Sequence, residues 1–244
     1  MSKIKISEVN VNLWNKYTVK FEPHSDVNII VGINGSGKTT LLLEIENIVS
    51  KTLGSRGSYI YIPSIDNLLL RDKRKKETAL SQDLDSYIYD MKTGPSLMYY
   101  RMSMLDASTS EQEKVRKRIH HFCNIVNNLF KDTQKSIEIE GNKFIIKKND
   151  SELSPNSLSS GEKQLLLILL RVFLLDEQES VVLIDEPENS LDISWQYKLI
   201  DLLVKLNPNA QFFITTHSPS IFGDGWGDKI IYMEDVTTNI EKVL

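Results

Sequence analysis

The sequence predicts an α/β fold with a mainly parallel core sheet, an N-terminal antiparallel β subdomain and a helical insert. Apolar runs typical of buried strands alternate with helical patterns on both sides of the insert, and such alternation favours a parallel sheet. The stretches 3–9 and 17–21 alternate polar with apolar residues, which indicates antiparallel strands. Residues 64–135 are instead rich in charge, Met and Leu, and we interpret most of them as a helical subdomain.

The expected strands are defined by apolar composition and by the turn residues at their ends. The runs 27–31 and 181–184 are almost wholly apolar, as is typical of parallel strands buried on both faces. Glu140-Gly141-Asn142 separates two short strand patterns and indicates a hairpin. In chain order, strands are expected at 3–9, 17–21, 27–31, 59–62, 136–139, 143–147, 181–184, 211–216 and 229–233.

The expected helices follow from apolar spacing and from breaker residues. Thr, Gly and Pro follow one another at 93–95 and predict a break within the insert, while residues 150–157 are polar and are expected to form a loop. Helices are expected at 39–50, two or three times within 64–132, at 161–175 and at 194–206.

Length and composition favour one domain over residues 1–244, with the helical subdomain at 64–135 inside it. The chain has 244 residues, 41% of them hydrophobic, and a net charge of -4, so it does not resemble a basic nucleic-acid coat. Its longest apolar run, 165–170, is far shorter than the roughly 20 residues that span a bilayer. With Cys123 as the only cysteine, a cytoplasmic protein without a membrane partner is expected.

A glycine-rich turn lies between the strand expected at 27–31 and the helix expected at 39–50. It reads Gly32-Ile33-Asn34-Gly35-Ser36-Gly37-Lys38-Thr39 and matches the phosphate-binding pattern G-x-x-x-x-G-K-[ST]. Lys38 would place a cation on the β- and γ-phosphates, Thr39 would offer its hydroxyl to Mg²⁺, and Thr40 would reach the α-phosphate. Main-chain N–H groups at a helix N-terminus bind phosphate oxygens, as expected here for Asn34, Gly35, Ser36 and Gly37.

Two acids, Asp185 and Glu186, end the buried strand expected at 181–184. Side chains alternate along a strand, so the two carboxylates are expected to point to opposite sides. Asp185 could hold Mg²⁺, and Glu186 could orient the attacking water as a general base. On their own, two acids at a strand end are also typical of a solvated turn. His217 follows the strand expected at 211–216, where it would either polarise the γ-phosphate or have only a structural role.

The apolar helix expected at 161–175 is preceded by Ser159 and Ser160. The spacing of Ser159 and Glu162 is that of a capping box, so the stretch could simply start a helix well. Gly161 is unfavourable in a helix, costing up to about 1 kcal/mol relative to Ala in a helix interior. Close approach of the main chain to a phosphate would explain the glycine, and we therefore keep both interpretations.

Together these motifs resemble the ABC ATPase family. Leu158–Glu162 is similar to its signature motif, Ser190-Leu191-Asp192 to its D-loop, and His217 to its switch histidine, in the family's order over nearly the whole chain. Residues 185–191 and 216–219 resemble the SMC, RecF and OLD-type branch. The resemblance implies the P-loop NTPase fold of an ABC ATPase head, with ATP and Mg²⁺ as cofactors and ATP hydrolysis as the reaction.

The resemblance also implies partners. In the family, the signature of one chain closes the ATP bound by another, which implies a homodimer that sandwiches ATP. Ser159, Ser160 and Gly161 would then contact the partner's nucleotide, and Asp192 would lie near the joint. Heads of this branch handle DNA or control a nuclease or other effector, often in phage defence. No nuclease motif follows His217, so an effector or nuclease is expected to be a separate chain.

Some positions depart from the family pattern. The signature lacks the second Gly and the Gln of transporters, and no Q-loop glutamine follows the strand ending near Ile62; Gln82 is a remote candidate. Trp14 and Tyr17 are candidates for stacking on adenine. The missing glutamine and the variant pair Glu188-Asn189 count against the main alternative function, the nucleotide-binding subunit of an ABC transporter. A P-loop kinase would leave the signature unexplained.

Two basic stretches, 71–76 and 114–118, both fall in the expected helical insert. Each is either a solvated helix face or a contact with DNA, RNA or an acidic partner. No aromatic residues are interleaved with them to stack bases.

Overall fold

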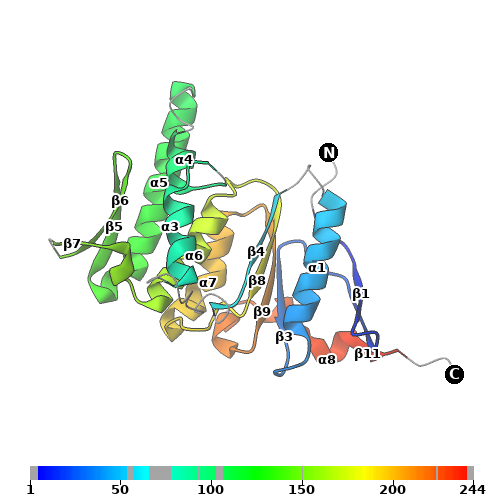
Figure 1. Ribbon diagram of the computed structural model, residues 1–244. Coiled ribbons are helices and arrows are strands. Elements are labelled where there is room, and N and C mark those ends of the chain that lie inside the picture. Colours follow the sequence, from blue (N-terminus) through cyan, green and yellow to red (C-terminus); the bar gives the residue numbers. More distant parts are fainter. Residues whose placement is uncertain are drawn as a thin grey trace. The chain divides into compact units, whose positions relative to one another are not determined.

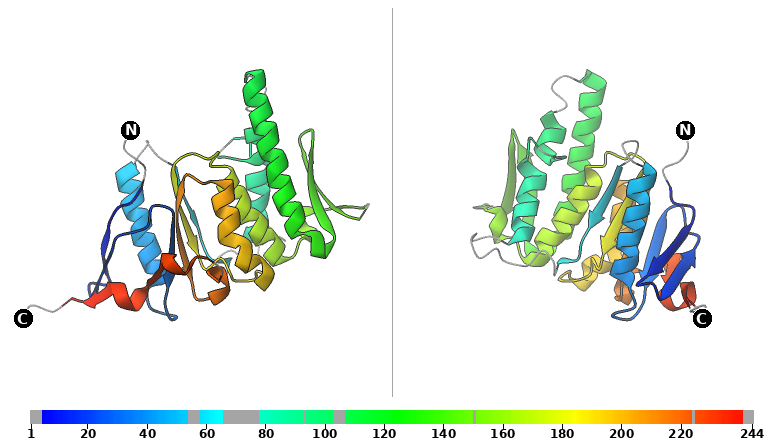
Figure 2. Two further views of the ribbon diagram at one scale, coloured as in Figure 1. Left: turned by 180° about the vertical axis from the view of Figure 1, so that it is seen from behind. Right: turned by 45° about the vertical axis from the view of Figure 1, so that its right-hand side comes forward.

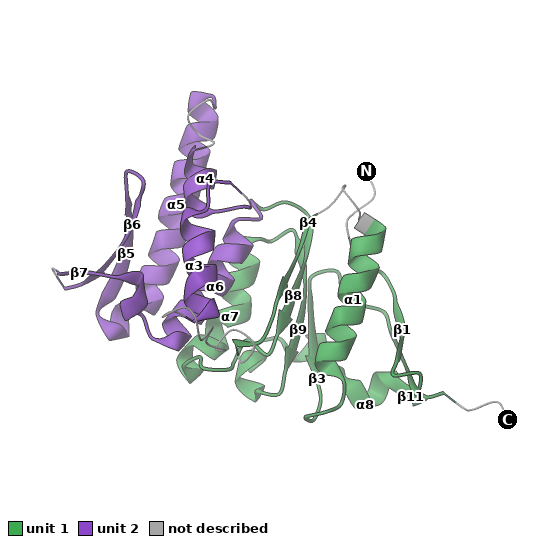
Figure 3. Cartoon of the chain, in the orientation of Figure 1, with its two compact units in different colours: residues 1–65, 177–244 green, residues 66–176 purple. Residues whose placement is uncertain are grey.

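The computed structural model describes residues 5–53, 58–65, 78–92, 94–102, 107–149, 151–223 and 225–240. The chain divides into two compact units (Figure 3), of which the first comprises residues 1–65 and 177–244 and the second residues 66–176. Unit 2 thus contains most of the expected insert and continues to Asp176. The basic stretch 71–76 lies outside the described residues.

Unit 1 is built on a five-stranded sheet in which every neighbouring pair is parallel, as expected. Its core strands are almost fully buried, because Val, Ile, Leu and Phe occupy both faces. The register pairs Asp185 with Thr215, so these two strands end side by side. The order across the sheet is β10 (Ile230–Tyr232), β3 (Val27–Val31), β9 (Ala210–Thr216), β8 (Ser180–Asp185) and β4 (Ser58–Ile62).

Helices cover the two faces of this sheet (Figures 1 and 2). On one face lies α1 (Lys38–Leu53), whose buried side chains, among them Leu41 and Ile45, pack in one core with Leu183 and Phe213. On the other lies α7 (Ile193–Leu206), with a buried stripe of Trp195, Leu199, Ile200, Leu203 and Leu206. The face with α1 also carries a small antiparallel sheet.

The small sheet has the order β1-β2-β11 and forms the expected N-terminal subdomain. Its strands are β1 (Val9–Leu13), β2 (Tyr17–Phe21) and β11 (Thr237–Asn239), and the short helix α8 (Met233–Val236) precedes β11. The prediction of a first strand at 3–9 was wrong, because the alternating buried positions begin at Val9. The last predicted strand, 229–233, is shorter, because Met233 already starts α8.

Unit 2 combines four helices, among the residues described, with a three-stranded antiparallel sheet of order β5-β6-β7. The predicted break near Gly94 lies between α3 and α4, and the predicted hairpin turns at Gly141, whose φ is +54°. The prediction of a loop at 150–157 was wrong, because Leu153 pairs with Ile146 in a third strand. The elements are α3 (Ala79–Tyr89), α4 (Leu97–Met102), α5 (Thr109–Leu129), β5 (Lys135–Glu140), β6 (Lys143–Lys148), β7 (Ser151–Leu153) and α6 (Ser160–Phe173).

Candidate functional site

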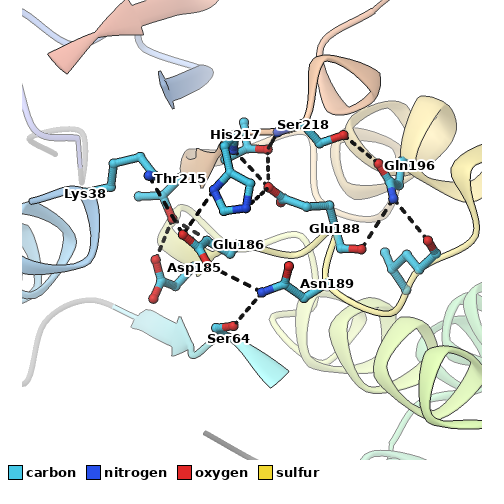
Figure 4. Close-up of polar contacts among 12 residues, drawn as sticks. Lys38, Ser64, Asp185, Glu186, Glu188, Asn189, Gln196, Thr215, His217 and Ser218 are labelled. Carbon is cyan, nitrogen blue, oxygen red and sulfur yellow. Dashed lines mark hydrogen bonds and ion pairs between the residues drawn. The ribbon is translucent and has the colours of Figure 1, made fainter. Parts of the chain in front are cut away.

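Three loops of unit 1 meet where the parallel strands β3, β8 and β9 end. The glycine-rich turn follows β3, Glu186 follows β8, and His217 follows β9. Carboxyl ends of parallel strands lie at the same edge of a sheet, which is where ligands bind in open α/β folds. The motifs predicted from the sequence in unit 1 are therefore brought together by the strand order alone, and Figure 4 shows their side chains.

The Lys38 side chain reaches back across the glycine-rich turn. Lys38 is only 4% exposed, and its Nζ donates to the carbonyl oxygens of Gly32 at 3.0 Å and Ile33 at 3.3 Å. Gly37 has a φ of +93°, and a Cβ at this position would lie 2.8 Å from the Trp14 ring, so glycine is required on two grounds. Ser36 Oγ is buried without a hydrogen-bond partner among the described residues, which fits a loop that binds phosphate oxygens.

Asp185 is connected to α1 and β9 by hydroxyl groups. Thr39 Oγ1 lies 3.1 and 3.0 Å from the two Asp185 carboxylate oxygens, and Thr215 Oγ1 donates to Asp185 Oδ1 at 2.6 Å. The Asp185 side chain is 2% exposed. Mg²⁺ takes hard oxygen ligands and usually binds through one or two protein groups together with phosphates. The Thr39 hydroxyl and the Asp185 carboxylate are a donor set that fits this ion.

Glu186 leaves the strand in a left-handed conformation with a φ of +46°. Its N–H donates to the carbonyl oxygen of Thr215 at 3.1 Å, which fixes the turn. The side chain then points away from the Asp185 contacts: Oε1 lies 3.4 Å from Nδ1 of His217 and 3.9 Å from Nζ of Lys38. A carboxylate, an imidazole and an ammonium group thus converge, with the carboxylate 22% exposed and able to reach a ligand.

Glu188 is a residue of this site whose role the sequence did not reveal. Its Oε1 accepts from Thr216 Oγ1 at 2.7 Å and from the His217 N–H at 2.9 Å. The side chain is 6% exposed, and Oε2 has no hydrogen-bond partner among the described residues. Glu188 therefore fixes the main chain that carries His217. The only sequence signal was a second acid two positions after Glu186.

Gln196 on α7 makes a second connection between the same two loops. Its Nε2 donates to the carbonyl oxygens of Leu191 at 3.0 Å and Glu188 at 3.4 Å, and its Oε1 accepts from Ser218 Oγ at 2.8 Å. Hydrogen bonds to Thr216 and to Ser218, the residues before and after His217, thus tie the loop after β9 to the loop after β8 and to α7 (Figure 4).

Asn189 connects Glu186 to the end of β4. Its Nδ2 lies 3.4 Å from Glu186 Oε2 and donates to Ser64 Oγ at 3.1 Å. Ser64 lies two residues beyond the last residue of β4, where the family resemblance places a Q-loop glutamine. A buried serine that bonds to Asn189 therefore occupies that region, while Gln82 lies on α3 in unit 2.

A pocket of about 630 Å³ opens beside the glycine-rich turn. Trp14 and Tyr17 line it, with ring centroids 6.1 Å apart and planes at 84°, together with Met233 and Gly35. The Trp14 side chain is 51% exposed. Both aromatic residues suggested by the sequence thus lie beside the glycine-rich turn, on apolar walls that suit a flat base.

The remaining sequence candidates lie at helix starts. In unit 2, Ser159 caps α6: its Oγ accepts from the Glu162 N–H at 3.2 Å, and Glu162 Oε2 accepts from the Ser159 N–H at 2.7 Å. The Ser159 and Ser160 side chains are exposed, while Gly161 is buried. In unit 1, exposed Asp192 caps α7 by accepting from the Ser194 N–H at 2.8 Å, and hydrogen bonds from the Ser194 hydroxyl and N–H lower the Asp192 pKa.

Glu162, the acid of the α6 capping box, also forms an ion pair. Lys135 Nζ lies 2.7 Å from Glu162 Oε2. Burial would raise the pKa of Glu162, but the bonds from Lys135 and from the Ser159 N–H outweigh it, so the pKa is lowered. The start of α6 is thus held rigidly by charge-assisted bonds.

Comparisons with known proteins agree with this geometry. Residues 66–223 match the AAA_21 family, described as "AAA domain, putative AbiEii toxin, Type IV TA system". The chain is 27% identical over 206 residues to the energy-coupling factor transporter ATP-binding protein EcfA2 of Methanospirillum hungatei, covering 84% of this chain and 45% of that protein. It is 39% identical over 89 residues to the "Retron Ec83 probable ATPase" of Escherichia coli, covering 32% of this chain and 16% of that protein.

The chain therefore spans less than half the length of these two relatives. Among solved structures, an SMC head bound to the C-terminal winged-helix domain of ScpA superposes with a TM-score of 0.52 at 19% identity, covering 92% of this chain and 96% of that one. Within the described part of the chain, none of the helices combines the length and the apolar character that crossing a membrane requires.

Proposed function

Because the chain belongs to the AAA_21 family and has the fold of ABC-type and SMC-head P-loop domains, we propose that it is an ATPase whose reaction takes place where β3, β8 and β9 end. The observation that carries the proposal is the convergence of four side chains at one sheet edge, where Thr39 is hydrogen-bonded to Asp185 and Lys38 is paired with Glu186.

In the proposed site, the triphosphate lies on the N–H groups of residues 34–40. Lys38 exchanges its carbonyl partners for the β- and γ-phosphates, since an ammonium binds an anion more strongly than a neutral carbonyl. Thr39 and Asp185 hold Mg²⁺, which neutralises phosphate charge when bound. The base lies against Trp14 and Tyr17.

Glu186 is the proposed general base. Its partly exposed carboxylate would accept a hydrogen bond from a water molecule near the γ-phosphate and then take the proton as that water attacks phosphorus and the bond to ADP breaks. Lys38 Nζ at 3.9 Å and His217 Nδ1 at 3.4 Å keep the carboxylate directed toward the phosphate end of the loop. ADP and phosphate are the products.

The site is proposed to be completed by a second copy of the chain. Ser159 and Ser160 are exposed at the N-terminus of α6, where the helix dipole favours an anion such as a phosphate. Donated by a partner chain, together with Gly161 and with Asp192 near the joint, they would close the ATP bound by Lys38. Two equivalent sites give a symmetric dimer that forms with ATP and loosens after hydrolysis.

For the biological role, we propose a switch that controls a separately encoded effector acting on nucleic acid or in defence against phage. The similarity to an ATPase named for retron Ec83 supports this role. The second candidate is the nucleotide-binding subunit of a transporter, favoured by the similarity to EcfA2 over most of this chain. A serine and an asparagine in place of a Q-loop glutamine count against the transporter.

Phosphate release by the full chain with Mg²⁺ and ATP tests the proposed reaction. We expect turnover that is lost in Lys38→Ala and slowed by about 10²–10⁴-fold in Glu186→Gln, while the folded content of both variants stays that of the wild type. Turnover that persists in both variants would place the reaction elsewhere.

A further inference from the structure

A long groove of about 890 Å³ in unit 2 is not used by the proposed reaction. It runs between one face of α5 and the hairpin β5–β6, which lie beside each other in Figure 1. Residues 136–139 of β5 form one wall, and Arg101 and Met102 at the end of α4 contribute to the lining. The α5 wall repeats at helical spacing and consists of Gln112, Arg116, Ile119, His120, Cys123, Asn124 and Asn127.

The groove is cationic. Arg101 and Arg116 line it, and Glu138, the acid among its described lining residues, is already paired with Lys147. Nη1 of Arg101 is buried and has no hydrogen-bond partner within the described ranges. A buried guanidinium N–H without an acceptor carries an uncompensated desolvation cost, which an anionic oxygen in the groove would remove.

Arg116 differs from the neighbouring cations of the same helix because its side chain lines the groove. In the basic stretch 114–118, Arg118 donates to the Phe173 carbonyl oxygen at 3.1 Å and pairs with Asp176 at 3.2 Å, so it is structural. Lys117 pairs with Glu113 at 3.5 Å on the helix surface. Arg116 is the member of the stretch whose side chain lines the groove.

The opposite wall offers a strand edge. Among the described strands, whose order is β5-β6-β7, β5 has a neighbour on one side only. The Asn127 side chain bonds to the main chain of β5 as an adjacent strand would. Its Nδ2 donates to the Ile137 carbonyl oxygen at 3.1 Å and its Oδ1 accepts from the Ile137 N–H at 2.6 Å. Main-chain groups two residues apart on a strand face the same way, so those of Ile139 also face the groove, and no second side chain among the described residues bonds to them.

We propose that this groove binds an extended, acidic segment of a partner protein, with a carboxylate on Arg101 and Arg116 and its main chain alongside Ile139. Strand addition to a free edge, with pockets for alternate side chains, is a known mode of peptide recognition. Met102, Ile119 and Ile139 provide apolar contacts for such side chains.

A peptide fits better than a nucleic acid. Among the described residues, no Phe, Tyr or Trp lines the groove, so a run of bases would have only the His120 ring to stack on, and a nucleic acid could not use the strand edge. Burial raises the pKa of Cys123 to about 11, with a smaller contribution from Glu138, so the thiol in the groove stays neutral and does not repel a carboxylate.

Selection of a phage-displayed library of random eight-residue peptides on the full chain tests the proposal. We expect enriched peptides with Asp or Glu between apolar residues. Fluorescence anisotropy with synthetic copies should show binding that is about tenfold or more weaker to Arg116→Glu, as for the loss of one charge-assisted bond. Lys114→Glu reverses an exposed charge on the same helix outside the groove lining and should bind within about twofold of the wild type.

Several results would overturn the proposal: no enrichment, enrichment without acidic residues, or equal binding to wild type and Arg116→Glu. Displacement of the peptides by a single-stranded poly-dT oligonucleotide, with the same dependence on Arg116, would assign the groove to nucleic acid instead. Peptide binding should be unchanged in Lys38→Ala, so the result of this test does not depend on the proposed ATPase reaction. Unchanged circular dichroism of Arg116→Glu excludes misfolding as the cause of weaker binding.

Discussion

Nδ1 of His217 lies 3.4 Å from Oε1 of Glu186, although the two residues end different strands. The parallel pairing of β8 with β9 sets this distance, since Asp185 lies opposite Thr215. Oε1 of Glu188 then fixes the His217 main chain by accepting a hydrogen bond of 2.9 Å from its N–H. The carboxylate proposed as base is therefore positioned by strand register and by a second, buried carboxylate.

Replacing Glu186 by Gln should leave ATP binding intact and slow hydrolysis by about 10²–10⁴-fold, the usual contribution of general-base catalysis. The amide keeps the shape and one acceptor oxygen but cannot take a proton from water. Phosphate release measures the rate, and calorimetry measures binding. Glu22→Gln, an exposed acid at the end of the β1–β2 hairpin opposite Trp14, serves as the control. A rate within about twofold of the wild type would move the base elsewhere, with His217 examined next.

Replacing Lys38 by Ala should abolish ATP binding. The substitution removes the buried ammonium that crosses the loop between the carbonyl oxygens of Gly32 and Ile33 and that is proposed to bind phosphates. Titration calorimetry at millimolar ATP and Mg²⁺ provides the measurement. Lys51→Ala, at the last turn of the same helix, should bind as the wild type does. Unchanged affinity in Lys38→Ala would remove the phosphate-binding role of the turn.

Replacing Glu188 by Ala should lower both stability and turnover. The buried Thr216 hydroxyl and the part-buried His217 N–H lose their acceptor, which costs about 1–3 kcal/mol for the buried hydroxyl and less for the N–H that water can reach. Turnover should fall with little change in KM, because His217 moves while the phosphate-binding turn does not. Glu188→Gln retains an acceptor oxygen and should recover most of both properties. A Glu188→Ala variant with lower Tm and normal turnover would make Glu188 purely structural.

The fold and most of the site could be predicted because their signals are local in sequence. The turn at 32–39 and the apolar strand before Asp185 each lie within about ten residues. The contacts of Glu188, Asn189 and Ser64 could not be predicted, because they join residues 28 and 125 positions apart through the strand order. The edge strand β11 is short and polar, so no apolar pattern indicates it.

The ion pair at the start of α6 should make unit 2 sensitive to acid. The folded-state pKa of Glu162 is lowered, so its contribution to stability is fully present above the unfolded pKa near 4.5 and is lost as pH falls through the folded value. The difference in unfolding free energy between wild type and Glu162→Gln should therefore shrink below about pH 4.5. The control Glu152→Gln, on the exposed strand β7, should show no such trend. A difference that is constant with pH would mean that the ion pair with Lys135 does not stabilise the fold.

The proposed dimer gives the last prediction. Lys38 and Ser160 are each suited to phosphate but belong to different units of the chain, one at the end of β3 and the other at the start of α6. If Ser160 serves a partner's nucleotide, ATP should convert Glu186→Gln from monomer, or a looser assembly, into a stable dimer, because bound ATP is held and not hydrolysed. Light scattering with and without ATP measures this.

Ser160→Arg should keep ATP binding and lose hydrolysis, since the exposed side chain would enter the partner's site. The control Ser151→Arg, exposed on β7, should keep both ATP binding and hydrolysis. Mixing Lys38→Ala with Ser160→Arg should restore activity, because one site of each mixed dimer combines an intact turn with an intact α6 start. A monomer whose turnover per chain is independent of concentration would exclude the shared site.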